Sequence, residues 1–510
     1  MEMHKRLGLA KPSFNMQNRS ISKLINPKTL TLVFCFVVIP LILILLAVRP
    51  AIASTPKHFD ELTFKPLPEL KLPPYEQFKL KNGMTVFLME DHELPLVGGN
   101  LMVHTGSRNE DADRAGLASL TGSVLRSGGT VKTPSNPLNE LLEQKSASIE
   151  SGISVNSGSV SFSSLTEDLP QVFDLFAEVI QSPALPQDKI DLTKFQTRGG
   201  IARRNDQANG ILGREFRKLI YGATSPYART VEYATIDRIT QADVKSFYQS
   251  QFQPENFILG IVGDINPTEM KKTIEAKFGN FKPSTNGSKS VQNGSVQQAQ
   301  GSGIFFASKP ELTQSSIQIG HLGGKVIDRD YPALSVMNDI LSGFGGRLFN
   351  EVRSRQGLAY SVYAAWSPQF DYPGIFVAGG DTKSESTVPF IRGVLKEIDR
   401  IRTEPVTQDE LQRAKDSVIN SFVFNFDDRS KVLSRVMRYE YFGYPKDYLF
   451  QYQKAVAATT IQDIQQVAAR NIKPSQLVTM VVGNEKAIVP ALSTLNQSVK
   501  AIDISIKGAK

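Results

Sequence analysis

The sequence predicts an α+β protein made of two homologous halves, each with an antiparallel sheet flanked by helices. One observation is an internal repeat: residues 240–264 align with residues 460–484 at a constant shift of 220, without a gap. Upstream, residues 187–190 align with 408–411 at a shift of 221. A second observation is that helical and strand-like periodicities alternate within both copies. Two such halves facing each other would leave a cleft, which is a usual place for a large ligand.

Composition divides the 510-residue chain into six expected segments. These are a basic segment with a transmembrane or signal segment (1–54), a proline-rich tether (55–76), the first half (77–281), a low-complexity linker (282–303), the second half (304–497) and a C-terminal tail (498–510). The tether and linker compositions are typical of extended or flexible chain, so the two halves should carry the function.

The N-terminal segment contains the apolar run Leu30–Val48, which is long enough to cross a bilayer. Basic residues precede this run, so we expect the N-terminus in the cytoplasm and the body outside it, in a periplasmic or lumenal compartment. Ala51 and Ala53 then form a small-residue pattern typical of signal-peptidase cleavage. A retained membrane anchor and a signal cleaved after Ala53 both remain open.

The charge and cysteine content exclude several classes of function. The formal net charge is +8, but residues 1–54 hold a net +6 of it, which leaves the body nearly neutral. A nearly neutral body argues against nucleic acid as a partner. The only cysteine, Cys35, lies in the apolar run. The body therefore has no disulfide, thiolate nucleophile or cysteine zinc site.

The first half begins with strands and a helix. The run Phe78–Met89 alternates around Asn82-Gly83, which predicts a hairpin, and Leu96–His104 predicts a further strand. Gly116–Arg126 has helical spacing, with Leu117, Leu120 and Val124 on one face. The remaining predictions are an alternating stretch at Ile149–Leu165, helices at Leu169–Ile180, Pro186–Asp206 and Asp243–Gln251, and a buried strand at Phe257–Val262.

The second half contains a stretch with a glycine pair, Gly345-Gly346, followed by helical spacing that Gly357 should end. Leu348 and Val352 should face a core, and the charged residues Arg347, Glu351 and Arg355 should share a polar face. A strand-like run, Tyr360–Trp366, follows. Arg353 and Tyr360 therefore flank a helix-to-strand corner, where side chains can converge on a ligand. On the local pattern alone, a surface helix with solvated arginines is the alternative.

Together these motifs resemble the insulinase/pitrilysin family of zinc metallopeptidases, which includes the mitochondrial processing peptidases. The resemblance runs from about Tyr75 to about Gln497. It is carried by the hairpin at 80–84, the stretches 106–110 and 116–118, and above all Arg353 to Tyr360. It implies tandem α+β domains that enclose a chamber for an extended peptide substrate.

The family's zinc motif is missing from this chain. Active members carry His-x-x-Glu-His, in which two imidazoles on one helix face bind Zn²⁺ and the glutamate acts as general base. The matching positions here are Ser119, Gly122 and Ser123, and the place of the distal glutamate ligand falls near residues 198–200, which include no carboxylate. The resemblance thus implies no catalytic residue and no metal bound by this chain.

Other histidines give little support for a different zinc site. The body contains His58, His92, His104 and His321, and no two of them stand three or four residues apart. Surface or strand histidines explain them more simply than zinc ligands do.

The corner in the second half does match the family. The resemblance implies that Arg353 and Tyr360 hold the substrate main chain near the scissile carbonyl, because both donate hydrogen bonds to oxygen. It also implies substrate contact at Gly345 and Gly346, which resemble the family's glycine-rich loop, although the run is shorter here.

Two functional hypotheses follow. In the first, the chain is the non-catalytic, substrate-positioning subunit of a heterodimeric peptidase, and a paralogous partner carries the zinc. In the second, it is a pseudo-enzyme that binds peptides or scaffolds a membrane complex without proteolysis. A self-sufficient peptidase with a different metal site is the least favoured, since the ligands and the base are absent together.

Overall fold

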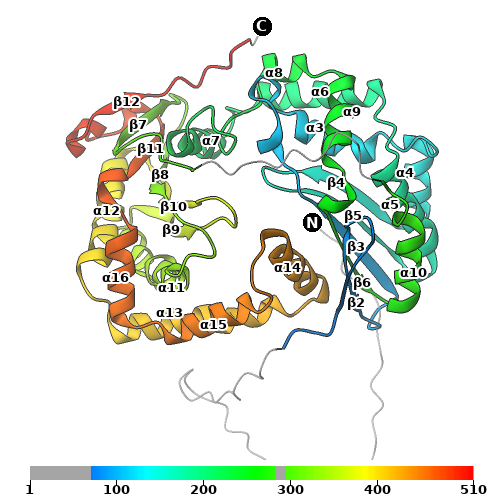
Figure 1. Cartoon of the computed structure of the whole chain (residues 1–510). Coiled ribbons are helices and arrows are strands. Elements are labelled where there is room, and N and C mark those ends of the chain that lie inside the picture. The colour runs from blue at the N-terminus through cyan, green and yellow to red at the C-terminus, as the bar shows by residue number, and fades with distance from the viewer. Residues whose placement is uncertain (1–70, 283–294, 509–510) are drawn as a thin grey trace, which may run out of the picture. The chain divides into compact units, whose positions relative to one another are not determined.

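The computed structural model describes residues 71–282 and 295–508 (Figure 1). The predicted transmembrane or signal segment, with Cys35 and Ala53, lies outside these ranges, as do most of the tether, including His58, and much of the linker. Among the described helices, none combines the length and the apolar character that crossing a bilayer requires.

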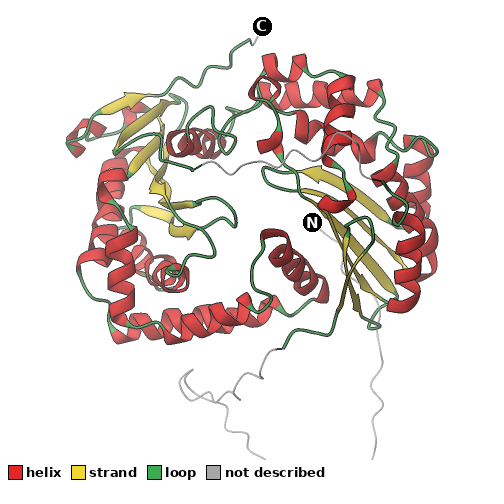
Figure 2. Ribbon diagram, viewed as in Figure 1, coloured by secondary structure: helices red, strands yellow, loops and turns green. Residues whose placement is uncertain are grey.

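Two six-stranded sheets form the centre of the fold (Figure 2). The first has the order β1 (Glu76–Lys79), β2 (Thr85–Glu90), β6 (Phe257–Gly263), β3 (Leu96–Val103), β5 (Gly158–Leu165) and β4 (Ser148–Ile153). The second has the order β12 (Val499–Ala501), β7 (Gly303–Ser308), β11 (Val478–Gly483), β8 (Gln314–Leu322), β10 (Ile375–Lys383) and β9 (Ala359–Ser367).

The sheets are mixed, which corrects the prediction of purely antiparallel sheets. Strand β2 runs parallel to β6, and β7 runs parallel to β11 and β12. The physical reason is that most of each half lies between the paired strands β2 and β6, or β7 and β11. That intervening chain returns the second strand in the same direction as the first.

Helices surround both sheets. In the first half they are α3 (Leu117–Ser127), α4 (Ser135–Gln144), α5 (Leu169–Gln181), α6 (Gln187–Ala202), α7 (Ala208–Tyr221), α8 (Tyr233–Arg238), α9 (Gln241–Gln251) and α10 (Pro267–Phe278). In the second half they are α11 (Tyr331–Ser342), a π-helix (Phe349–Arg355), α12 (Thr387–Thr403), α13 (Gln408–Asn420), α14 (Arg429–Phe442), α15 (Tyr448–Ala458) and α16 (Ile461–Asn471).

The predicted repeat is confirmed at the level of side chains. Thr240 and Thr460 cap α9 and α16 with the same capping box, in which each backbone N–H lies 2.9 Å from the carboxylate three residues on. Helices α6 and α13 begin at Gln187 and Gln408, the two residues that the alignment pairs. The two halves therefore begin α9 and α16 with the same local signal, whereas α6 and α13 begin at equivalent residues with different caps, Pro186 and Thr407.

Each sheet is covered on both faces, and one cover comes from the other half of the sequence. In β2, Val86 and Leu88 face the core shared with α3 and α5, whereas Phe87 and Met89 face α14. Helix α7 packs in the same way on β8 and β11 (Figure 1). Helices α7 and α14 occupy matching places in the repeat, so the halves exchange equivalent helices.

Polar contacts reinforce this exchange. The Tyr441 hydroxyl of α14 lies 2.7 Å from the Asn156 carbonyl oxygen and 3.1 Å from that of Val103. Arg108 forms a partly buried ion pair with Asp371 from the second half. The halves are thus joined by polar contacts as well as by an apolar core.

The segment expected as a C-terminal tail is partly ordered into the fold. Residues 499–501 form strand β12 beside β7. Beyond it, the Ile504 carbonyl oxygen accepts a hydrogen bond from the Asn205 side chain at 2.5 Å, and Ile506 packs against the core of the first half. The last described residues therefore cross from the second sheet to the first half.

Candidate functional site

The helix that aligns with the family's zinc helix is α3, and a buried acidic residue fixes its start. The two carboxylate oxygens of Glu110 accept hydrogen bonds from the backbone N–H groups of Gly116 and Ala118, at 3.0 and 2.7 Å. Burial raises the pKa of Glu110, against these two hydrogen bonds. Glu110 belongs to a motif that carried the family resemblance, and its role here is structural.

The three positions on α3 that match the zinc motif, Ser119, Gly122 and Ser123, offer no metal ligands. Ser119 and Ser123 are exposed, and the Ser123 hydroxyl donates to the Ser119 carbonyl oxygen at 3.1 Å. Gly122 faces strand β4, where a Cβ atom would lie 2.5 Å from the Ile153 backbone nitrogen. The place of the family's catalytic glutamate is therefore closed by the backbone of the sheet, and no side chain fits there without moving α3.

The position expected for the distal ligand is also occupied by structural contacts. The Nη1 atom of Arg198 on α6 lies 2.8 and 2.7 Å from the two carboxylate oxygens of Asp237, and its guanidinium lies over the Tyr233 ring. Gly199 and Gly200 follow it on the same helix. Residues 198–200 of α6 thus supply no carboxylate for a metal.

The histidines of the described residues have other partners. His92 is exposed and lies between Asp264 and Glu90, whose hydrogen bonds raise its pKa. His104 stacks on Tyr441, and burial lowers its pKa. Burial lowers the pKa of His321 to about 4, and its ring bridges two backbone groups. Across residues 71–282 and 295–508, no group of three or more His, Cys, Asp or Glu side chains is arranged to hold a metal ion.

The corner in the second half is a π-helix followed by the edge strand β9. Leu348 and Val352 are fully buried, and Gly357 ends the helix with a φ of 62°, as the sequence predicts. The prediction that Arg347 shares a polar face with Glu351 and Arg355 is wrong for Arg347. Its guanidinium is buried and pairs with Glu410 of α13, because the wider π-helical turn and the preceding glycine loop direct it inward.

The structure brings Arg353 and Tyr360 together. The guanidinium carbon of Arg353 lies 4.6 Å from the centroid of the Phe349 ring and 5.1 Å from that of Tyr360. Tyr360 is 86% exposed, and within the described residues its hydroxyl has no hydrogen-bond partner. The pair is therefore held by cation–π contacts, and its N–H and O–H donors remain available to a ligand.

The glycine loop lies beside this pair. Gly345 has a φ of 76°, which glycine adopts readily, and its carbonyl oxygen accepts a hydrogen bond from Asn350 at 2.7 Å. Gly346 is closely surrounded, since a Cβ atom there would lie 2.9 Å from the Gly343 carbonyl oxygen. The close backbone contacts favour a structural need for Gly346, whereas a Cβ atom at Gly345 would meet only the Arg413 side chain, at 3.5 Å.

Sequence reasoning missed two aromatic residues at this corner. Phe344, between the glycines, is 100% exposed, and its ring centroid lies 5.9 Å from that of Phe349. Phe344, Phe349, Arg353 and Tyr360 thus form a continuous strip, which we call the aromatic strip; its two ends, Phe344 and Tyr360, are exposed, and Phe349 and Arg353 are half-buried. The signal available in the sequence was a phenylalanine placed between Gly343 and Gly345, where no helical or strand pattern would bury it. The strip can hold a peptide by stacking and by hydrogen bonds to carbonyl oxygen, but it has no nucleophile or base.

Comparison with known families agrees with this geometry. Residues 85–221 match the family described as "Insulinase (Peptidase family M16)", and residues 238–418 match "Peptidase M16 inactive domain". Together the two matches cover more than half of the chain. The chain belongs to the insulinase (M16) family. The family resemblance predicted from the motifs is therefore confirmed.

Similar M16 proteins differ in how they are described. An "Uncharacterized zinc protease" of Rickettsia bellii is 26% identical over 348 residues, which are 67% of this chain and 81% of that protein. A "Non-peptidase homolog YmxG" of Helicobacter pylori is 22% identical over 423 residues, which are 79% of this chain and 92% of that protein. The family thus includes both proteins named as proteases and a protein named as a non-peptidase.

Solved structures show the same fold. A peptidase M16 inactive domain from Pseudomonas fluorescens superposes with a TM-score of 0.71 at 24% identity, covering 80% of this chain and 98% of that one. A protease from Helicobacter pylori superposes with a TM-score of 0.72 at 20% identity, covering 81% and 100%. These likenesses establish the M16 fold for almost the whole described chain.

Proposed function

We propose that this M16 protein is the non-catalytic, substrate-positioning subunit of a heterodimeric zinc peptidase that acts on peptides outside the cytoplasm. Its partner would be a paralogous chain that carries His-x-x-Glu-His and the zinc. An extended peptide would lie in a chamber, with its main chain held by Arg353 and Tyr360. The predicted N-terminal segment would place the complex at a membrane.

One combination of observations supports this proposal. The place of the catalytic glutamate is closed by the contact of Gly122 with β4, whereas Tyr360 is exposed to solvent beside the half-buried Arg353. A chain without any part in proteolysis would have no chemical need for a donor pair at this corner. A donor pair strengthens its hydrogen bonds as a carbonyl oxygen gains charge, which is useful only beside a nucleophile. In this chain the nucleophile must come from elsewhere.

The test is reconstitution with a zinc-bearing paralogue from the same organism. The purified chain alone should hydrolyse no peptide, and the mixture should hydrolyse a fluorogenic peptide. Tyr360→Phe keeps the ring over Arg353 and removes only the hydroxyl, so it should lower kcat/KM by about tenfold or more. Arg353→Ala should lower it at least as much.

A matched control lies on the same helix. Arg355 is exposed and pairs only with Glu351 across one turn, so Arg355→Ala should leave kcat/KM nearly unchanged. Equal activity of the wild-type and Tyr360→Phe mixtures would rule out the proposed role of the pair.

The second candidate function is a pseudo-enzyme that binds peptides or scaffolds a membrane complex. It is favoured by the similarity to a protein named as a non-peptidase homologue. Under this function, peptide binding would not depend on any zinc-bearing chain, and no mixture would gain activity. Metal analysis of the purified chain tests the zinc assignment separately, because tightly bound stoichiometric zinc would contradict a site in the partner alone.

A further inference from the structure

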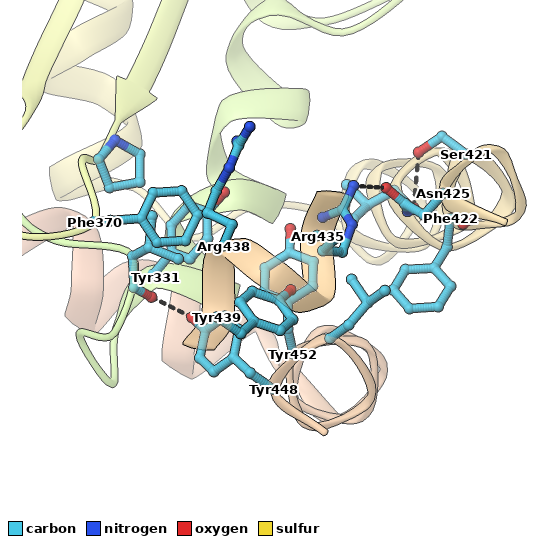
Figure 3. A pocket seen from close by; sticks show the side chains of 14 residues that line it. Tyr331, Phe370, Ser421, Phe422, Asn425, Arg435, Arg438, Tyr439, Tyr448 and Tyr452 are labelled. Atoms are coloured by element: carbon cyan, nitrogen blue, oxygen red, sulfur yellow. Dashed lines mark hydrogen bonds between the residues drawn. The ribbon is translucent and has the colours of Figure 1, made fainter. Parts of the chain in front are cut away.

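A cavity of about 420 Å³ lies in the second half, apart from the aromatic strip (Figure 3). Helices α11, α14 and α15, the segment after α13 and the loop at Phe370 form its walls. Its lining includes four tyrosines and two arginines, Tyr331, Tyr439, Tyr448, Tyr452, Arg435 and Arg438. The residues that line it include no aspartate or glutamate. We call it the arginine–tyrosine pocket.

The two arginines have no acidic residue beside them in the lining of the pocket. They stand three residues apart on α14, and neither forms an ion pair within the part of the chain that the structure describes. Arg435 donates to the Asn425 side chain, but its Nε is buried without a hydrogen-bond partner. Arg438 is exposed, and its guanidinium lies 5.6 Å from the centroid of the Phe370 ring. A buried N–H of a cation without an acceptor costs free energy, which an anionic ligand would recover.

The tyrosines contribute ring surface more than hydrogen bonds. The Tyr448 hydroxyl donates to the Val326 carbonyl oxygen, and the Tyr452 hydroxyl donates to the Ser335 hydroxyl. The Tyr331 and Tyr452 rings stack with centroids 5.3 Å apart. Burial raises the pKa of Tyr331 and Tyr448, so both phenols stay neutral at physiological pH. The arginines are therefore the only charged residues of the lining, and the walls beside them are aromatic.

We infer that the arginine–tyrosine pocket binds a carboxylate attached to an apolar or aromatic group. The carboxylate would accept hydrogen bonds from Arg435 and Arg438, and the apolar group would pack against the tyrosine rings. The cavity volume suits one or two amino-acid residues and excludes a longer segment. Two sources share this chemistry: the C-terminal residue of a peptide and a small aromatic acid. The inference goes beyond the proposed function, since it needs neither the partner subunit nor Arg353 and Tyr360.

Isothermal titration calorimetry on the full chain in detergent tests this inference. N-acetyl-phenylalanine should bind, and its amide should bind about tenfold more weakly or not at all, because the amide lacks the charge. Acetate and inorganic phosphate should also bind more weakly, since they lack the apolar group. Equal binding of the amide, acetate or phosphate would overturn the inference. If a tripeptide ending in phenylalanine binds more tightly than phenylpropionate, the natural ligand is the C-terminus of a peptide. If phenylpropionate binds more tightly, the natural ligand is a small aromatic acid.

Three variants complete the test. Arg435→Gln should weaken N-acetyl-phenylalanine binding about tenfold or more. Arg438→Gln changes an exposed residue, so it keeps the test valid if Arg435→Gln fails to fold, and it should also weaken binding. Arg203→Gln changes an exposed arginine at the end of α6, far along the sequence, and should have no effect. Unchanged binding in Arg438→Gln and in a folded Arg435→Gln would contradict the assignment.

Discussion

At the scale of single residues, Gly122 explains why the zinc site cannot simply be restored in this chain. A side chain at this position meets the backbone of β4 at Gly152 and Ile153, and backbone atoms cannot rotate away as a flexible side chain could. Ser119 and Ser123, by contrast, face solvent. Loss of the ligands and loss of the space for the base are therefore two separate changes.

This difference gives a stability prediction. Ser119→His with Ser123→His should leave the melting temperature nearly unchanged, whereas adding Gly122→Glu should lower stability by about 1–3 kcal/mol or more through overpacking. Thermal unfolding followed by circular dichroism measures both. Gly213, in the middle of α7, is a matched control, because a Cβ atom there meets nothing within 4 Å. Gly213→Ala should stabilise the protein by about 0.5–1 kcal/mol. A fully stable Gly122→Glu variant would contradict the close contact.

Glu410 is the second residue with a specific prediction. It pairs with the buried Arg347 beneath the glycine loop and also caps α13. Burial opposes its ionisation, but hydrogen bonds from Arg347 and the Thr407 backbone outweigh burial and lower the pKa of Glu410 to about 2. Because the pKa of Glu410 is lower in the folded state than in the unfolded state, its ionisation stabilises the fold at pH values above the ordinary pKa of a glutamate. That stability should be lost as pH falls from about 4.5 toward 2.

The variant Glu410→Gln should test this pH dependence. It should cost roughly 3 kcal/mol at neutral pH, and its melting temperature should fall less steeply than that of the wild type between pH 5 and pH 3. Glu404→Gln, which alters an exposed pair with Arg400, should cost under about 1 kcal/mol. If the melting temperatures of the wild type and of Glu410→Gln fell equally between pH 5 and pH 3, the ion pair with Arg347 would not be the source of the pH dependence.

At the scale of elements, the exchange of α7 and α14 explains the composition of the central strands. Strand β6 is buried on both faces: Leu259 and Ile261 face the core of the first half, while Ile258 and Val262 face α14. Every residue of β6 and of β11 is buried, and their largely apolar sequences therefore reflect two covered faces, since a strand with one solvated face would alternate. The sequence showed these apolar stretches but not which helix lies on the second face.

Met437 of α14 packs closely against the first sheet. A Cβ atom on Gly260 of β6 would lie 2.2 Å from the Met437 sulfur, so the glycine makes room for the methionine. Met437→Ala should cost about 2–5 kcal/mol by leaving a cavity, and hydrogen exchange of the α14 amides should become faster. Lys431→Ala, on the exposed face of the same helix, should change neither. If Met437→Ala lowered stability without faster hydrogen exchange of the α14 amides, the destabilisation would not come from the contact between α14 and the first sheet.

At the scale of the whole molecule, each half depends on the other for the cover of its sheet. We expect fragments 71–282 and 295–510 to aggregate when expressed separately, because each exposes an apolar sheet face. Expressed together, they should form a soluble one-to-one complex. Size-exclusion chromatography with light scattering measures the outcome. If either fragment alone were monomeric and unfolded cooperatively, the halves would not depend on each other for the cover of their sheets.

Much of this organisation could be predicted from the sequence. The repeat, the Asn82-Gly83 hairpin and the helix that starts near Gly116 follow from local spacing and turn chemistry, and the structure confirms them. The corner at Arg353 was also predicted from local signals. The predictions that failed, strand direction and the inward turn of Arg347, depend on contacts between residues far apart in the chain.

By itself, the sequence determined that this protein has two related halves and lacks the zinc ligands and general base of its family. These properties are local, since they depend on residue identity and on periodicity within one element. Only the tertiary structure decided that Gly122 is closed by β4, that Arg353 lies over Tyr360, and that two arginines share an aromatic pocket. The physical reason is that close approach and burial arise between elements, where sequence spacing carries no information about distance.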